Sequence, residues 1–176
     1  MEAALETERL RLTPLTEADL DDLVDLDLDP EVRRFIDPHG TILPLDRGEL
    51  RTYEWERHVS PGGFYGTRER VGNGFVGVFQ LEAAPDRDGE AELGFRLGRH
   101  AWGLGYATEG GLALVAYAFD VLGFRRVYAH ALNDNPASIR VMEKVGLQPA
   151  GPWEYRGMPG VEYALERDGP GPTRGE

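Results

Sequence analysis

Cysteine is absent from this chain of 176 residues, which excludes disulfide bonds, thiolate metal sites and cysteine nucleophiles. Lysine occurs once, at Lys144, so the Gly-Lys-Ser/Thr ending of a P-loop is not present. No apolar run approaches the ~18 residues that a membrane span needs, and the first six residues lack the basic flank and apolar run of a secretory signal. We therefore expect a cytoplasmic protein without a membrane partner.

Positive charge is also scarce, because 19 Lys and Arg face 31 Asp and Glu for a formal net charge of −12. A nucleic-acid surface needs clustered positive charge, so we expect no nucleic-acid partner. The acidic excess either attracts a cationic substrate or simply solvates the surface. Both interpretations apply to Glu17–Glu31, which is rich in carboxylates and holds no Lys or Arg.

Histidine occurs four times, and no two of these residues have the spacing of a metal-ligand pair, so we expect no metal site. His130 lies on a predicted strand, where its side chain either faces a cleft or has a structural role. The other three are His39, His58 and His100.

The length predicts one domain over residues 1–167. From Asp168 onward the chain consists of Gly, Pro and polar residues, which predicts a disordered tail over residues 168–176.

The first part of the chain predicts helices with one strand before them. Alternating apolar and polar residues predict a strand over Glu8–Pro14. Thr16 is typical of a helix N-cap, and Pro and Gly residues predict a loop over 32–45. A second helix is predicted over Leu45–His58, with Asp46 as a candidate cap.

The middle of the chain predicts three strands joined by short turns, which form an antiparallel meander. A helix over Thr108–Leu122 and a strand over Arg126–Leu132 follow, so the last meander strand and this strand are expected to be parallel. The three meander strands are Phe64–Arg70, Phe75–Leu81 and Ala91–Leu97.

The last predicted helix is marked at both ends. Asn135 is its N-cap, Pro136 its first residue and Gly146 its C-terminal stop. Two further strands are expected, over Leu147–Arg156 and Val161–Arg167.

The segment Arg99–Ala107 joins the third meander strand to a helix and contains Gly103 and Gly105. Glycines in such a turn leave backbone N–H groups free to point at an anion, which the helix dipole also favours. A dinucleotide-binding fingerprint needs a third glycine within a βαβ unit. That glycine is not in place and a meander precedes the turn, so we expect a different phosphate ligand.

Two segments resemble the GNAT superfamily of N-acetyltransferases. His100-Ala-Trp-Gly-Leu-Gly-Tyr-Ala-Thr-Glu109 resembles its acyl-CoA pyrophosphate loop, Gln/Arg-x-x-Gly-x-Gly/Ala. The stretch from Asn135 to Leu147 resembles its Asn-x-x-Ser/Ala…Glu-Lys-x-Gly-Phe segment. The fuller Trp-Gly-x-Gly-Tyr-Ala-Thr-Glu string resembles the branch that contains the bacterial ribosomal-protein N-terminal acetyltransferases. The resemblance covers roughly residues 6–167.

The resemblance implies an α+β fold with a mostly antiparallel sheet of six to seven strands, a splayed parallel strand pair and about four flanking helices. The splayed strands would be Ala91–Leu97 and Arg126–Leu132, with the pantetheine arm of acetyl-CoA between them. The implied cofactor contacts are backbone N–H groups to the pyrophosphate, strand-like pairing with the pantetheine amides, and a hydrogen bond from Asn135, whose alternative role is capping alone. The implied cofactor-binding residues are Leu97, Gly98, Gly103, Leu104, Gly105, Tyr106, Ala107, Thr108, Asn135 and Ser138.

Two positions depart from the family pattern. His100 stands at the Gln/Arg position of the loop, and Met142 stands where many members place the tyrosine that protonates the leaving thiolate. Methionine cannot donate a proton. Ser138, one turn away, resembles the serine of the ribosomal branch; alternatively the thiolate leaves unprotonated, because a thiol has a pKa of only ~8.5.

Acetyl transfer requires a neutral amine, and alkyl amines are mostly protonated at neutral pH, so a base or a water path must remove a proton. Glu92 is our candidate base; the alternatives for it are a surface carboxylate or a partner for Arg96. A backbone N–H of the same strand would stabilise the oxyanion. Three aromatic residues either form walls of the acceptor site or are ordinary core or edge aromatics: Trp153, Tyr155 and Tyr163.

The resemblance therefore implies an enzyme that transfers an acetyl group from acetyl-CoA to a primary amine by direct attack in a ternary complex. The acceptor would be a protein N-terminus or a small-molecule amine, cationic in either case, and dimers are frequent in this family. The missing tyrosine at Met142 leaves a non-catalytic acyl-CoA-binding or sensory module as the alternative.

Overall fold

The computed structural model describes residues 4–41, 43–59 and 63–167. Within these residues eight strands are hydrogen-bonded in the order β1-β2-β3-β4-β5-β6-β8-β7, a mostly antiparallel sheet in which β5 and β6 are parallel. The α+β fold and the parallel pair confirm the expectation, while the sheet has eight strands rather than six or seven. One source of the difference is β1 (Leu5–Glu6), whose two residues are too few for a sequence pattern to reveal.

The chain divides into two compact units, and β4 and β5 each pass from one into the other. The first unit comprises residues 1–80 and 95–106, and the second comprises residues 81–94 and 107–176. None of the described helices is long and apolar enough to cross a membrane. The predicted tail from residue 168 onward lies outside the described residues.

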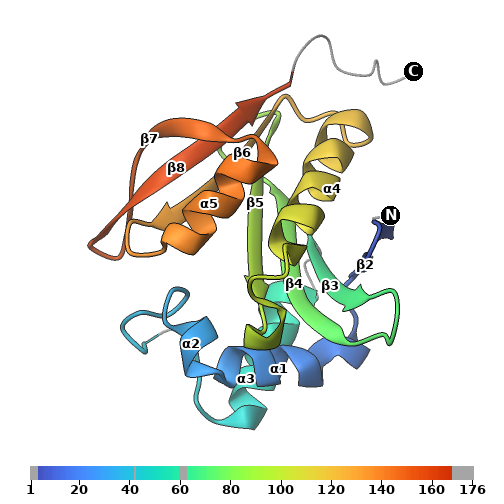
Figure 1. Ribbon diagram of the computed structural model, residues 1–176. Coiled ribbons are helices and arrows are strands. Elements are labelled where there is room, and N and C mark those ends of the chain that lie inside the picture. The colour runs from blue at the N-terminus through green and yellow to red at the C-terminus, as the bar shows by residue number, and fades with distance from the viewer. Residues whose placement is uncertain (1–3, 42, 60–62, 168–176) are drawn as a thin grey trace. The chain divides into compact units, whose positions relative to one another are not determined.

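The first unit combines antiparallel strands with the N-terminal helices (Figure 1). The strand β2 pairs with β3, and β3 with β4. Leu23 and Leu26 of α1 lie in one hydrophobic cluster with Phe64 and Val78 of β3 and β4. The elements of this unit after β1 are β2 (Leu10–Pro14), η1 (Glu17–Asp19), α1 (Leu20–Leu28), α2 (Pro30–Arg33), α3 (Arg47–Glu54), the π-helical turn η2 (Trp55–Val59), β3 (Phe64–Glu69), the first part of β4 (Phe75–Ala83), the end of β5 (Glu90–Leu97) and the 3₁₀ turn η3 (Arg99–Ala101).

Local capping fixes where these helices start. The Asp19 carboxylate accepts hydrogen bonds from the Thr16 N–H (3.0 Å) and hydroxyl (2.9 Å), and Asp46 accepts from the N–H groups of Gly48 and Glu49. Both predicted caps are thus confirmed. The predicted loop over 32–45 is partly wrong, because α2 extends to Arg33: Asp29 caps it and Pro30 occupies its first position.

The second unit is built on β6 (Arg126–Leu132), which pairs in parallel with β5 and antiparallel with β8 (Met158–Glu166). The outermost strand is β7 (Gln148–Tyr155), which pairs with β8. Pro149 and Pro152, predicted to interrupt this strand, are accommodated on it, and the register shifts between Pro149 and Gly151. Proline is tolerated here because β7 is an edge strand that need not donate on its outer side.

Two helices, α4 (Tyr106–Asp120) and α5 (Pro136–Val145), lie side by side in this unit (Figure 1). At Gly111 of α4, an added Cβ would lie 2.8 Å from Val145 of α5 and 3.9 Å from Leu93 of β5. The helices therefore cover the face of β5 on which Leu93 points. The α5 ends are confirmed, with Asn135 as N-cap, Pro136 first and Gly146 left-handed at the stop.

Candidate active site

The loop between β5 and α4 belongs to the first unit as far as Tyr106. It forms a 3₁₀ turn over Arg99–Ala101 and then passes through Gly103 (φ 75°) and Gly105 (φ 83°). Space alone does not require a glycine at position 103, because an added Cβ there would meet nothing within 4 Å. The positive φ requires it, since a Cβ disfavours that conformation.

The backbone of this loop offers unpaired donors. Within residues 4–41, 43–59 and 63–167, the N–H groups of Gly103, Leu104 and Gly105 have no hydrogen-bond acceptor. The loop is exposed and leads directly into α4, whose first turn also carries N–H groups without intrahelical partners. Such an arrangement can bind an anion such as a pyrophosphate.

Side chains of the first unit hold the loop in place. The Arg9 guanidinium donates to the Leu104 carbonyl (2.9 Å) and lies over the Tyr106 ring at 4.7 Å. Tyr106 in turn donates its hydroxyl proton to Glu69 at 2.7 Å. Arg9 is a cation beside this loop that the sequence did not point to. Its place as a polar residue in an alternating pattern predicted only that its side chain faces solvent.

Three predicted positions in this region have internal hydrogen bonds. The His100 ring donates through Nε2 to the Phe75 carbonyl at 2.9 Å. The Leu97 carbonyl accepts from the Trp102 indole at 2.7 Å, and the Gly98 N–H donates to the Val76 carbonyl at 3.0 Å. A carbonyl has two lone pairs, so Leu97 and Gly98 can each still accept a hydrogen bond from a ligand.

In the second unit the parallel pairing of β5 and β6 is short. Their paired residues are Glu90 with Arg126, Ala91 with Val127 and Glu92 with Tyr128, although β5 continues to Leu97 and β6 to Leu132. The pairing thus ends at Glu92 and Tyr128, on the two strands that were predicted to splay apart. Beyond that point the strands leave backbone groups that are not used by this ladder.

Glu92 and Leu93 point to opposite faces of β5, because side chains alternate along a strand. Helices cover the Leu93 face, so Glu92 lies on the other one, where its side chain is 37% exposed. Its ionic contact is His130, whose Nδ1 lies 3.3 Å from Oε1. Arg96, the alternative partner, instead contacts Asp27 and Glu54 in the first unit.

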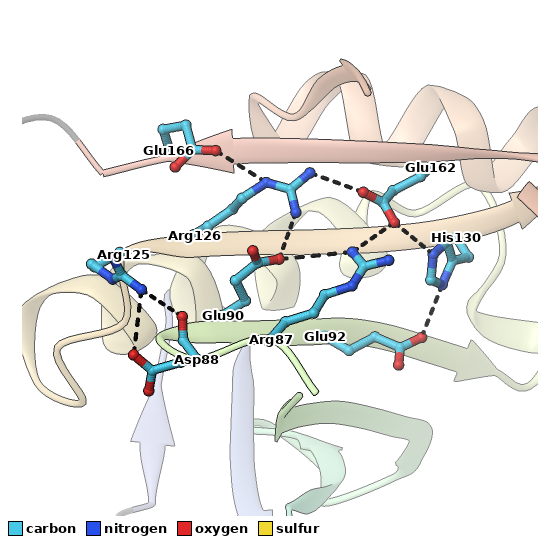
Figure 2. A network of polar contacts seen from close by, with 9 residues as sticks. All are labelled: Arg87, Asp88, Glu90, Glu92, Arg125, Arg126, His130, Glu162 and Glu166. Atoms are coloured by element: carbon cyan, nitrogen blue, oxygen red, sulfur yellow. Dashed lines mark hydrogen bonds and ion pairs between the residues drawn. The ribbon is translucent and has the colours of Figure 1, made fainter. Parts of the chain in front are cut away.

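His130 connects Glu92 to a network of charged side chains (Figure 2). Its Nε2 lies 3.0 Å from Glu162, which also accepts hydrogen bonds from Arg87 (2.8 Å) and Arg126 (2.9 Å). Partial burial alone would raise the pKa of Glu162, but the hydrogen bonds from Arg126, Arg87 and His130 lower it to about 2. Glu162 is therefore an anion throughout the physiological range.

Aromatic rings extend this network. The Trp153 ring stacks on His130 with centroids 4.4 Å apart and an angle of 8°, and Tyr155 stacks on Trp153 at 5.6 Å. Tyr163 does not belong to this group, because it is buried and its hydroxyl donates to Glu143 of α5. The three aromatic residues predicted together therefore lie apart, with two beside His130 and one against a helix.

The start of α5 carries the remaining predicted residues. The Asn135 side-chain oxygen accepts the Ser138 N–H at 3.2 Å, so its capping role is real, and its amide N–H₂ is not needed for that cap. Ser138 is half-buried in the first turn. Met142 is 1% exposed and packs in the core. Across the described part of the chain, no three His, Asp or Glu side chains are placed to hold a metal ion.

A family model described as an acetyltransferase (GNAT) domain matches residues 9–148. FsC-acetyl coenzyme A-N(2)-transacetylase of Aspergillus fumigatus is 34% identical over 151 residues, which cover 81% of this chain and 64% of the fungal protein. This chain thus spans slightly less than two thirds of that relative's length.

Two solved structures share the fold. A GNAT-family acetyltransferase from Bacillus anthracis matches with a TM-score of 0.81 at 20% identity, covering 93% of this chain and 98% of that one. Spermidine N-acetyltransferase from Vibrio cholerae, in complex with CoA and spermine, matches with a TM-score of 0.74 at 16% identity, covering 91% and 96%. At these identities the likeness shows the fold alone.

Proposed function

The chain belongs to the GNAT acetyltransferase family, and from that premise we propose that it transfers an acetyl group from acetyl-CoA to a primary amine by direct attack in a ternary complex. The observation that carries this proposal is the loop before α4, where Gly103, Leu104 and Gly105 present N–H groups without acceptors. A CoA pyrophosphate is the ligand for which such a loop is suited in this family.

The cofactor contacts follow from the groups that remain available. Backbone N–H groups from Gly103 to Thr108 would bind the pyrophosphate, with the Arg9 guanidinium beside them. The Leu97 and Gly98 carbonyls would accept from pantetheine amides, and the Asn135 amide would donate to the pantetheine arm.

The chemistry requires one group to accept a proton and another to donate one. Glu92 would deprotonate the acceptor ammonium, and Ser138 would protonate the leaving thiolate. Helix α5, which carries Ser138, packs on the face of β5 opposite to Glu92. Base and acid on opposite faces suit a thioester that lies in the gap between β5 and β6, and a β5 N–H would stabilise the oxyanion.

The acceptor is a small-molecule primary amine in our proposal, because the relative with 34% identity is named an N(2)-transacetylase. Trp153 stacks on His130, which contacts Glu92, and Tyr155 stacks on Trp153. Aromatic faces and carboxylates both attract positive charge, so this group would favour a cation. A protein N-terminus is the second candidate, from the resemblance of the loop to the ribosomal branch. A panel of small amines and peptides, assayed by release of free thiol, decides between them.

Cofactor binding is tested by isothermal titration calorimetry with acetyl-CoA. We expect Gly103→Glu and Gly105→Asp to abolish binding, because a carboxylate would enter the anion site. Gly72→Glu is the matched control: Gly72 also has a positive φ (85°) and open space around it, but it lies in the turn between β3 and β4. Unchanged binding in the two loop variants would overturn the proposed cofactor site.

The same assay separates the alternative of a non-catalytic module. An enzyme releases thiol in the presence of at least one amine of the panel. Tight acetyl-CoA binding without turnover on any of them would instead identify an acyl-CoA sensor.

A further inference from the structure

The contacts of His130 come from two different strands. On one side Nε2 lies 3.0 Å from Glu162 of β8, and on the other Nδ1 lies 3.3 Å from Glu92 of β5 (Figure 2). The side chains of His130 and Glu162 are each 13% exposed, whereas that of Glu92 is 37% exposed. Glu92 is thus the member of this row that solvent or a ligand reaches first.

Glu162 determines which nitrogen of His130 carries the proton. Two guanidinium groups, of Arg87 and Arg126, already donate to this carboxylate and keep it ionised. A carboxylate anion can only accept, so Nε2 must be the protonated nitrogen. The Trp153 ring, stacked at 4.4 Å, keeps the imidazole plane in this orientation.

The other nitrogen then faces Glu92 with a lone pair. When Glu92 is also ionised, two lone pairs oppose each other across 3.3 Å, and this contact becomes favourable only when a proton lies between Nδ1 and Oε1. The geometry therefore offers a proton a position between Nδ1 of His130 and Oε1 of Glu92.

The charge of the surroundings agrees with this. The carboxylates of Glu90, Glu92 and Glu162 outnumber the guanidinium groups of Arg87 and Arg126, so with a neutral His130 the network is negatively charged, and a proton reduces that charge. Glu166 adds a mostly exposed carboxylate on Arg126. A further ionisable neighbour is Tyr128, whose ring lies edge-on to His130; burial and the nearby Glu92 raise its pKa.

We propose that His130 is a positioning residue for acetyl transfer: it receives, through Glu92, the proton that the acceptor ammonium loses, while Glu162 holds its tautomer. This rests on the proposed function. The ammonium N–H bond breaks as an O–H bond forms on Glu92, and the proton then moves to Nδ1 of His130. The neutral amine forms the N–C bond with the thioester carbon and the C–S bond breaks. The thiolate takes the Ser138 hydroxyl proton, and the second amine proton restores that hydroxyl. The proton on His130 leaves to water after the turnover.

The test compares acceptors of different basicity. We expect His130→Gln to lower kcat for an alkylammonium acceptor by roughly 10-fold or more, a typical contribution of proton transfer at the low end, with the KM for acetyl-CoA unchanged. For an analogue whose amine is already neutral at the assay pH, the loss should nearly vanish, because no ammonium proton has to be removed. A merely structural role would lower kcat equally for both acceptors.

Further variants keep the proposal testable if His130→Gln does not fold. Glu162→Gln leaves the imidazole in place but removes the anion, and we expect a smaller loss with the same dependence on acceptor basicity. Glu166→Gln on the same strand and His39→Gln on an exposed turn are the matched controls and should retain full activity. An unchanged kcat in both His130→Gln and Glu162→Gln, or a loss that is independent of acceptor basicity, overturns the proposal.

Failure of the proposed function would be seen separately, as a wild-type protein that releases no thiol with any amine. Nitrogen-15 NMR of the histidine side chains does not depend on turnover. We expect Nε2 of His130 to stay protonated across the pH titration while Nδ1 changes, and Glu162→Gln to remove that preference. A His130 that loses the Nε2 proton first overturns the assigned role.

Discussion

Each unit of this chain contains a histidine whose ring nitrogen lies close to a glutamate carboxylate, and the two pairs differ in their surroundings. In the first unit His58 Nδ1 lies 2.7 Å from Glu54, whose side chain is completely buried. In the second unit His130 contacts Glu92, which is 37% exposed. The same pair of residue types is thus placed once in the core and once at a surface.

The buried cluster is poor in hydrogen bonds. Arg96 lies 2.9 Å from Asp27 and 3.1 Å from Glu54, and both carboxylates are inaccessible. Among the described residues, both Asp27 oxygens, one Glu54 oxygen, His58 Nδ1 and Arg96 Nε lack a partner with hydrogen-bond geometry. Burial raises the pKa of Asp27 to about 7 and lowers the pKa of His58 to about 3, so burial determines ionisation here.

The network around His130 is organised by hydrogen bonds instead. Glu162 accepts from two arginines and the histidine, and its pKa falls rather than rises. The comparison indicates that the buried cluster joins α1, α3 and β5 within the first unit, whereas the second network keeps a carboxylate in contact with solvent. Only the latter can exchange a proton with a substrate.

The largest effect is expected from removing the cation of the buried cluster. Arg96→Met leaves Asp27 and Glu54 without their counter-charge, and breaking such a pair costs about 3–5 kcal/mol. Urea unfolding measures the loss. Arg126→Met in the second network should cost only about 1–2 kcal/mol, because Glu162 retains Arg87 and His130. Equal losses would remove the distinction between the two clusters.

The second prediction concerns the same substitution in the two clusters, which should affect activity in one and stability in the other. Glu92→Gln should lower kcat by about 100-fold, a typical effect of losing a general base, while the Tm stays close to that of the wild type. Glu54→Gln, the matched change beside His58, should alter the free energy of unfolding and leave kcat intact. If Glu92→Gln proves fully active, Glu92 is not the base.

The third prediction concerns the pH dependence of stability in the first unit. Between pH 3.8 and about 7, the folded state keeps the Asp27 proton and the unfolded state has lost it. This group therefore lowers the free energy of unfolding as the pH rises through that window. His58 is neutral when folded down to about pH 3 but protonated below 6.5 when unfolded, so it makes stability rise with pH. Between about pH 4 and 6.5 the two slopes oppose each other.

Single variants should reveal each slope. Relative to the wild type, Asp27→Asn should gain stability with rising pH by about 1.4 kcal/mol per pH unit, and His58→Gln should lose it at a similar rate. Unfolding curves at pH 4.5, 5.5 and 6.5 measure both. Parallel profiles for the three proteins would show that burial does not control these two groups.

The smallest effect is expected at Asn135, where one side chain has both a structural and a proposed chemical role. Asn135→Ala should destabilise the protein by about 1 kcal/mol through loss of the α5 cap. Asn135→Ser keeps a capping oxygen but loses the amide donor, so it should retain stability and weaken acetyl-CoA binding. Retained affinity in Asn135→Ser would assign the residue to capping alone.

Sequence patterns predicted most of the elements of the fold because their signals are local. The caps at Thr16, Asp46 and Asn135 and the stop at Gly146 depend on backbone groups within a few residues. The turn at Gly103 and Gly105 was predicted for the same reason, because glycine favours a positive φ at its own position whatever the rest of the chain does. The two-residue β1 was missed because it is too short to show a period.

The network around His130 was not predictable in this way. Glu92 and His130 were each singled out, but Arg96 was offered as the partner of Glu92, four positions away, and the true contacts of Arg96 are Asp27 and Glu54. The contact of Arg9 with the loop was not predictable either, because 95 residues separate Arg9 from Leu104.

The sequence by itself therefore determined the elements, the glycine turn before α4 and the family to which the chain belongs, since these follow from neighbouring residues and from motifs of fixed spacing. Tertiary structure alone decided which histidine is buried and which lies beside an accessible carboxylate. Ionisation depends on solvent exclusion and on charges brought together from distant strands, and no local pattern encodes either.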